Sequence, residues 1–138
     1  MNNRLLVIED NEQNLYLMQF LLQKSGFEVV AAEDGIAGLD LALQCDPLAI
    51  LLDIQLPKMN GFAVAAELRR HRRLDRVPII AVTSYAMVGD REQILASGAT
   101  GYIEKPINPE TFVAEIKSYL PEGLEAADDW TPHPRCRR

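Results

Sequence analysis

The chain has 138 residues, of which 48% are hydrophobic and 25% are charged. These proportions are typical of a soluble globular protein, and the length suits one domain with a short remainder, so disordered, collagen-like and fibrous classes are excluded. The net charge of −6 argues against a nucleic-acid-binding surface, which needs clustered cations, and we expect no direct contact with nucleic acid. The one basic run, residues 69–76, is interrupted by apolar and acidic residues and predicts a solvated helix end.

The sequence carries no sign of a membrane segment or a signal peptide. No apolar stretch approaches the roughly 20 residues that a helix needs to cross a bilayer. The first residues, Met1 to Arg4, lead straight into an apolar run and leave no room for a signal peptide. We therefore expect a cytoplasmic protein with no membrane contact.

Short apolar runs rich in Val, Ile and Leu recur along the chain and predict strands. Four of them cover residues 5–8, 49–52, 77–82 and 101–103, and a further strand is predicted over residues 28–32. The four runs do not alternate polar with apolar side chains, which is typical of strands buried on both faces of a parallel sheet.

Helical patterns follow each of these strands. After the first strand, Leu15, Met18 and Leu22 keep a helical period until Gly26. Further helices are expected from Asp34 to about Gln44, from Asn60 onward, from about Asp90 to Ser97, and from Asn108 onward with Pro109 in the first helical position. In the third helix we expect a buried stripe made of Phe62, Ala65, Ala66 and Leu68. Five β/α units in series predict an α/β fold, a parallel sheet with helices on both faces.

Polar side chains follow four of the strands at the point where each strand ends. They are Glu9 and Asp10, then Asp53, then Thr83 and Ser84, then Lys105 before Pro106. Because ligands bind outside the carboxyl ends of the strands in an open parallel sheet, we expect these groups to converge. A carboxylate cluster, a hydroxyl and an ammonium in one crevice predict a site for a divalent cation and a phosphoryl group.

This ordered set resembles the receiver domain of two-component response regulators, over about residues 4 to 120. It is most similar to the single-domain regulators of the chemotaxis and cell-cycle type. The resemblance implies a flavodoxin-like, doubly wound sheet of five parallel strands in the order 2-1-3-4-5 with five helices. We expect residues 1–120 to form the receiver domain and residues 121–138, which show no periodic pattern, to form a flexible C-terminal tail.

The resemblance also implies a role for each site residue. Asp53 would be the phosphoacceptor and form an acyl phosphate. Asp10 and Asp53 would ligate Mg²⁺ directly, with Glu9 acting partly through water and the backbone carbonyl of Gln55 adding another oxygen. Lys105 would pair with the phosphoryl oxygens, and its bond to the following proline is commonly cis in this family.

The same resemblance implies a switch and two kinds of partner. Thr83 would donate its hydroxyl to the phosphoryl group, and Tyr102 on the fifth strand would then move from outside to inside. A histidine kinase or a histidine phosphotransfer protein would supply the phosphoryl group. A downstream protein would bind the face made by the fourth helix, the fifth strand and the fifth helix, roughly residues 90–119. The protein would assist its own phosphorylation and dephosphorylation but would not otherwise be an enzyme.

Three alternative functions fit the sequence less well. An aspartate-nucleophile phosphatase of the haloacid dehalogenase type needs a second Asp two residues after the first, where this chain has Gln55. A mononucleotide or flavin module needs a glycine-rich loop after the first strand, where this chain has acidic residues. A receiver-like module that binds partners without phosphorylation usually lacks one of the key residues, and none is missing here.

Overall fold

The structure is a computed structural model that describes residues 3–56, 60–84 and 88–120. Five parallel strands form one sheet in the order β2-β1-β3-β4-β5. The strands are β1 (Arg4–Ile8), β2 (Glu28–Ala32), β3 (Ala49–Asp53), β4 (Ile79–Thr83) and β5 (Gly101–Glu104). The predicted fold class and strand order are confirmed. The predicted tail, residues 121–138, lies outside the described residues.

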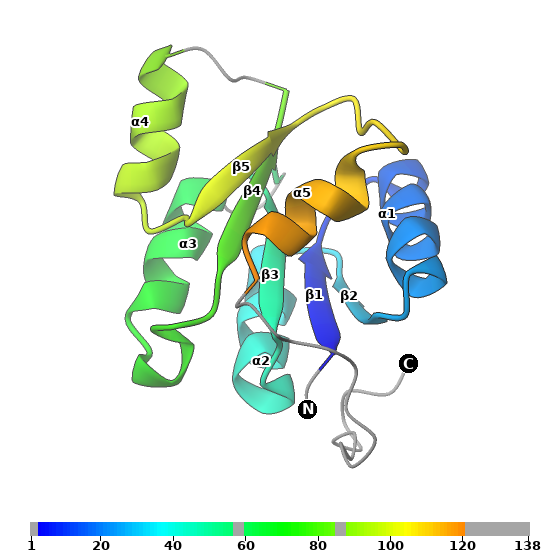
Figure 1. Cartoon of the computed structure of the whole chain (residues 1–138). Helices are drawn as coiled ribbons and strands as arrows, with labels where there is room; N and C mark the ends of the chain where they lie inside the picture. Colours follow the sequence, from blue (N-terminus) through cyan, green and yellow to red (C-terminus); the bar gives the residue numbers. More distant parts are fainter. Residues whose placement is uncertain (1–2, 57–59, 85–87, 121–138) are drawn as a thin grey trace.

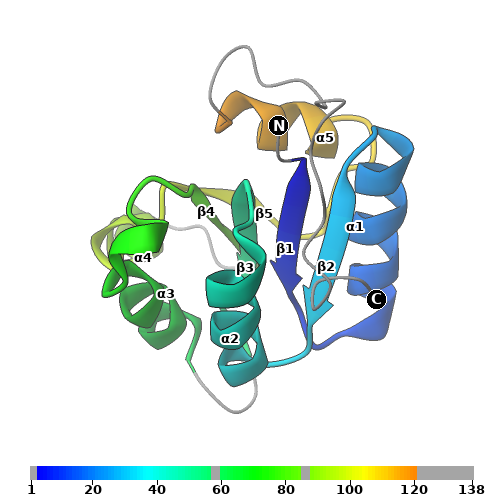
Figure 2. The same ribbon diagram turned by 90° about the horizontal axis from the view of Figure 1, so that it is seen from below.

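Helices cover both faces of the sheet (Figures 1 and 2). They are α1 (Glu12–Lys24), α2 (Gly35–Cys45), α3 (Gly61–Arg69), the short 3₁₀ helix η1 (Arg72–Leu74), α4 (Val88–Ala96) and α5 (Phe112–Ser118). The two figures show α1 and α5 on one face and α2, α3 and α4 on the other. In the part of the chain that the structure describes, no helix is long and apolar enough to span a bilayer.

Each central strand contributes to two separate cores, one on each face of the sheet. In β1, Leu5 and Val7 pack toward α1 and α5, whereas Leu6 and Ile8 pack toward α2 and α3. All four side chains are fully buried. Successive side chains of a strand point to opposite faces, so a strand covered on both sides must be apolar throughout. This is why the apolar runs that predicted the strands do not alternate polar with apolar side chains.

Two sequence-based expectations about helices were wrong in detail. In α3 the buried residues are Gly61, Val64, Ala65 and Leu68, while Ala66 is exposed. Of the expected stripe, Ala65 and Leu68 are buried and Phe62 packs half-buried against the core, so the expectation was wrong only for Ala66. The last helix begins at Phe112 and not at Pro109. Asn108 does accept a hydrogen bond from the Glu110 N–H at 3.0 Å, but residues 109–111 form a turn.

In the basic run, Arg70, Arg72, Arg73 and Arg76 are exposed as expected, and of its arginines only Arg69 is not a solvated residue. Its guanidinium donates hydrogen bonds to the backbone carbonyls of Leu74, Val77 and Gly98 at 2.6, 2.9 and 2.8 Å. Partial burial lowers the pKa of this guanidinium from its usual value. Arg69 therefore joins the end of α3 to the segments that lead into β4 and β5.

Candidate functional site

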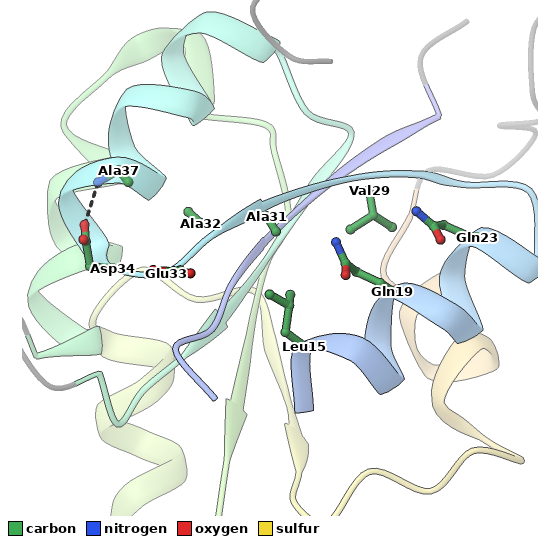
Figure 3. A pocket seen from close by; sticks show the side chains of 9 residues that line it. All are labelled: Leu15, Gln19, Gln23, Val29, Ala31, Ala32, Glu33, Asp34 and Ala37. Atoms are coloured by element: carbon green, nitrogen blue, oxygen red, sulfur yellow. Dashed lines mark hydrogen bonds between the residues drawn. The ribbon is translucent and has the colours of Figure 1, made fainter. Parts of the chain in front are cut away.

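One groove of the surface runs along the outer edge of β2, beside α1 (Figure 3). It measures about 490 Å³, and its charged groups are the carboxylates of Glu33 and Asp34. The Asp34 carboxylate already accepts a hydrogen bond from the Ala37 N–H at 2.8 Å and caps α2. Within the described ranges, none of the predicted site residues lines this groove, so they converge elsewhere.

Three predicted metal ligands lie together at the carboxyl ends of two neighbouring strands. Glu9 and Asp10 follow β1, and Asp53 is the last residue of β3, which pairs with β1. One carboxylate oxygen of each residue lies within 4.8 Å of the other two. Glu9 and Asp53 are only 1% and 3% exposed, whereas Asp10 lies at the surface. The cluster therefore consists of two buried acids and one acid at the opening.

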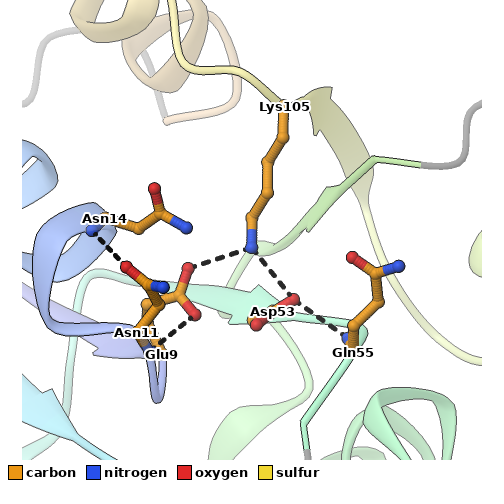
Figure 4. A network of polar contacts seen from close by, with 6 residues as sticks. All are labelled: Glu9, Asn11, Asn14, Asp53, Gln55 and Lys105. Atoms are coloured by element: carbon orange, nitrogen blue, oxygen red, sulfur yellow. Dashed lines mark hydrogen bonds and ion pairs between the residues drawn. The ribbon is translucent and has the colours of Figure 1, made fainter.

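Lys105 enters the same cluster from the loop after β5 (Figure 4). Its Nζ atom lies 3.1 Å from Oε1 of Glu9 and 3.4 Å from Oδ1 of Asp53. Its backbone N–H donates to the carbonyl of Thr83 at 2.8 Å, which ties the loop to the end of β4. The Lys105–Pro106 peptide bond is cis, as the resemblance implies. The ammonium thus sits between the two buried carboxylates.

Backbone donors orient both buried carboxylates. The Asn11 N–H donates to Oε2 of Glu9 at 3.3 Å, and the Gln55 N–H donates to Oδ1 of Asp53 at 2.9 Å. Asn11 also caps α1, since its side chain accepts a hydrogen bond from the Asn14 N–H at 2.9 Å. Asn11 was not among the predicted site residues. An Asn directly before a helical pattern is a recognisable N-cap signal, and it could have identified this residue.

The start of α3 packs directly on the backbone that follows Asp53. A Cβ atom added at Gly61 would lie 2.4 Å from the Cα of Ile54, which is too close for any side chain. The Gly61 N–H donates to the Ile54 carbonyl at 3.1 Å. A larger residue at position 61 would therefore displace the loop that carries Asp53.

The electrostatics of the cluster are unbalanced without a further cation. Burial, together with the neighbouring Asp53 carboxylate, raises the pKa of Glu9 from 4.5 to about 7, although the Lys105 ammonium acts in the opposite direction. In addition, Oε1 of Glu9 is buried and makes no hydrogen bond of good geometry to any described residue, despite its short distance to Lys105. One ammonium does not compensate the three acids.

These residues fit a Mg²⁺ ion. Mg²⁺ prefers hard oxygen ligands, keeps several water molecules, and is usually held by one or two carboxylates together with phosphate oxygens. Two buried carboxylates with one unsatisfied oxygen, and a third carboxylate at the opening, offer such a ligand set. A divalent cation would also favour the charged form of Glu9, against the burial and the Asp53 charge that raise its pKa.

Thr83 and Tyr102 lie on neighbouring strands. Thr83 is the last residue of β4 and is buried, whereas Tyr102 is half-buried on β5. In the register of this parallel pair, Ala81 lies opposite Tyr102, and Thr83 lies opposite Glu104. Thr83 and Tyr102 are therefore diagonal neighbours on the same face of the sheet, two residues apart in register.

Comparison with known sequences places the chain among signalling proteins. A family model described as the response regulator receiver domain matches residues 5–117. The polar-differentiation response regulator DivK of Brucella ovis is 42% identical over 120 residues, which is 87% of this chain and 98% of the relative. DivK of Brucella anthropi shows the same identity and coverage.

Solved structures of a response regulator and of a receiver domain are also similar to this chain. The chemotaxis response regulator CheY4 of Vibrio cholerae superposes with a TM-score of 0.83 at 28% identity, covering 87% of this chain and all of that one. The receiver domain of sensor histidine kinase PA1611 from Pseudomonas aeruginosa superposes with a TM-score of 0.79 at 32% identity, covering 86% and 98%. That structure is described as having a magnesium ion coordinated in the active site cleft.

Proposed function

The chain belongs to the response regulator receiver domain family, whose members are phosphorylation-dependent signalling switches, and we propose that Asp53 is its phosphoacceptor. The observation that carries the assignment is the position of Asp53. It ends β3 beside the ammonium of Lys105 and close to the carboxylates of Glu9 and Asp10. Among the described carboxylates, Glu9 and Asp53 share burial, a backbone N–H donor and the neighbouring ammonium, and of these two only Asp53 ends a strand.

The proposed reaction is a phosphoryl transfer to the Asp53 carboxylate. One of its oxygens attacks the phosphorus atom of a phosphohistidine on the donor protein, the P–N bond breaks, and the imidazole leaves with the electron pair. The product is an acyl phosphate. The transfer needs little covalent chemistry from the protein, because positioning and charge neutralisation lower most of its barrier.

Mg²⁺ would be held by the carboxylates of Asp10 and Asp53, by Glu9 partly through water, and by the backbone carbonyl of Gln55. When bound, the ion would neutralise charge on the carboxylates and on the incoming phosphoryl oxygens. The support for this ligand set is the cluster of three acidic oxygens within 4.8 Å and the unsatisfied oxygen of Glu9.

The remaining roles belong to Lys105 and Thr83. Lys105 ends in a compact charge on a flexible stem, so after transfer its ammonium can turn from the carboxylates to the phosphoryl oxygens. Thr83 ends the strand next to β3 and carries a hydroxyl that would donate to the same oxygens. We expect no catalysis of a separate substrate.

Receiver domains interact with histidine kinases or phosphotransfer proteins, and one of these is the expected donor here. We place the output at the face formed by α4, β5 and α5. Tyr102 and Glu104 of β5 reach that face, and Thr83 links it to the site through the pairing of β4 with β5. Cytoplasmic location follows from this proposal, since donors of this kind present their histidines there.

Phosphorylation with a small phosphodonor tests the assignment. Incubation with acetyl phosphate and Mg²⁺ should add one phosphoryl group, detected by mass spectrometry, that is labile to base and hydroxylamine. Asp53→Asn should abolish the addition, whereas Asp40→Asn, an exposed acid on α2, should leave it unchanged. Labelling of the Asp53→Asn variant at the wild-type level would show that another residue is the acceptor.

A further inference from the structure

A second groove, of about 480 Å³, is lined by residues of β5, of the loop after it and of the α5 segment, and not by Glu9, Asp10 or Asp53. Figure 1 shows β5 and α5. The residues that matter for its chemistry are Tyr102 and Glu104 of β5 together with Glu115 and Tyr119 of the α5 segment. Among the described residues that line this groove, none is Lys or Arg. The groove therefore combines two tyrosine rings and two carboxylates without a cation in its lining.

One tyrosine–carboxylate pair of the groove, Tyr102 with Glu104, already contacts a guanidinium. The Cζ atom of Arg91, from α4, lies 5.4 Å from the centroid of the Tyr102 ring. Its Nη2 atom lies 3.6 Å from Oε1 of Glu104. A guanidinium is attracted both to the face of an aromatic ring and to a carboxylate, and here one arginine uses both. Tyr102 and Glu104 together therefore already bind one cationic side chain, that of Arg91.

The α5 segment carries a second pair of a carboxylate and a tyrosine ring, which are Glu115 and Tyr119. Glu115 and Tyr119 are four residues apart and so lie on the same side of the helix segment. The Tyr119 ring packs closely on Gly101, where an added Cβ would lie 2.2 Å from it. Glu115 accepts a hydrogen bond from the Thr111 hydroxyl at 3.2 Å, and no ion pair joins it to a Lys or Arg of the described chain.

We propose that this groove binds a basic segment of the downstream protein partner, with an Arg or Lys side chain seated between Tyr119 and Glu115. The inference rests on the proposed function, since the groove lies on the proposed output face, and it names the chemistry of the partner. The overall charge of −6 favours the approach of a basic partner and disfavours an acidic one or a nucleic acid.

A pair of matched synthetic peptides tests the chemistry. In the first, arginines alternate with alanine and serine; in the second, citrulline replaces each arginine and keeps the shape without the charge. We expect the arginine peptide to bind the full-length protein at least roughly fivefold more tightly, in the free or the beryllofluoride-treated state. NMR signals of Tyr102, Glu104, Glu115 and Tyr119 should shift. Equal affinity for the two peptides in both states would overturn the proposal.

Two double variants with the same change in net charge separate the groove from general electrostatics. Glu104→Gln with Glu115→Gln should remove most of the preference for the arginine peptide. Asp40→Asn with Glu67→Gln, on α2 and α3, should keep the wild-type preference. Equal weakening in the two double variants would overturn the site.

A peptide with the sequence of residues 130–138 carries three arginines. If it binds more tightly than the arginine probe, the occupant is the end of this chain and the partner assignment is wrong.

Both double variants should be phosphorylated on Asp53 as the wild type is. Loss of peptide binding with normal phosphorylation affects only the groove, whereas failed phosphorylation with normal peptide binding affects only the assignment of Asp53.

Discussion

The Nζ atom of Lys105 lies 3.1 Å from Oε1 of Glu9, and yet the pKa of Glu9 is raised to about 7. Burial favours the neutral acid, and the nearby Asp53 carboxylate adds to this effect through a hydrogen bond and its charge. A single ammonium, shared between two carboxylates, does not reverse the balance. The site is thus built to accept additional positive charge.

The raised pKa of Glu9 predicts how stability depends on pH in the metal-free protein. The folded state holds this proton up to about pH 7, whereas the unfolded chain releases it near the ordinary value of 4.5. The stabilising contribution is therefore complete below pH 4.5 and is lost as the pH rises through 7. Melting temperatures measured in EDTA should fall by several degrees between about pH 5 and about pH 8.

The Glu9→Gln variant is the matched control for this pH dependence. A glutamine imitates the neutral acid and does not titrate, so the fall in melting temperature over the same range should be clearly smaller. Identical pH slopes for the wild type and Glu9→Gln would show that other groups cause the dependence.

The two acids next to each other after β1 should contribute differently to Mg²⁺ binding. Asp10→Asn removes a proposed direct ligand and should lower Mg²⁺ affinity by roughly tenfold or more. Glu9→Gln should cost less, because its proposed contact is partly through water. Isothermal titration calorimetry at fixed pH measures both. Equal losses would mean that the direct and water-mediated roles are wrongly divided.

Removing the ammonium should separate metal binding from signalling. Lys105→Ala leaves the three acidic oxygens in place, so Mg²⁺ affinity should stay nearly intact. The phosphoryl oxygens would then lack their proposed cationic partner, and the NMR shifts that beryllofluoride causes at Tyr102 should be lost. Wild-type shifts in Lys105→Ala would place the coupling on another residue.

Arg69 is expected to matter for stability and not for chemistry. Arg69→Ala would leave backbone carbonyls that now accept its hydrogen bonds without a partner, at a cost of about 2 kcal/mol in unfolding free energy. Arg70→Ala is the matched control, since Arg70 is exposed and makes a surface ion pair with Glu67 worth less than about 1 kcal/mol. Urea denaturation of both variants checks the difference.

Much of this architecture is predictable from the sequence, because strands buried on both faces leave an unmistakable apolar pattern. The same pattern marks where each strand ends, and that is why Glu9, Asp53 and Lys105 could be expected to meet. Parallel strands bring their carboxyl ends to one edge, so the order of residues along the chain is enough. The convergence of these residues can therefore be predicted without knowledge of any long-range contact.

The details that escaped prediction depend on tertiary packing. The expected burial of Ala66 in α3 was wrong because an alanine can be buried or exposed at little cost, so only the packing against the sheet selects Val64 over Ala66. Arg69 looked solvated because its partners are backbone carbonyls, which carry no sequence signal. The cation site of Arg91 joins α4 to β5 and is likewise visible only in three dimensions.

We expect the signal to pass from Asp53 to the output face through Thr83 and Tyr102. Thr83 and Tyr102 share one face of the sheet as diagonal neighbours, so a Thr83 hydroxyl drawn toward a phosphoryl group would vacate space that the Tyr102 ring can fill. That movement would withdraw the ring from Arg91, which now contacts it. A two-state side chain of this kind converts a local change of charge into a change of surface.

NMR spectra of the free and beryllofluoride-bound protein should show this path residue by residue. We expect shifts that spread from Asp53 through Thr83 and Tyr102 to α4 and α5. In Thr83→Val the hydroxyl is missing while the shape is kept, so shifts should remain around Asp53 but fade at Tyr102 and at Arg91. Shifts confined to the loops around Asp10, Asp53 and Lys105 in the wild type would show that the two side chains do not carry the signal. A Tyr102 that responds equally in Thr83→Val would move for another reason, with Lys105 as the next residue to test.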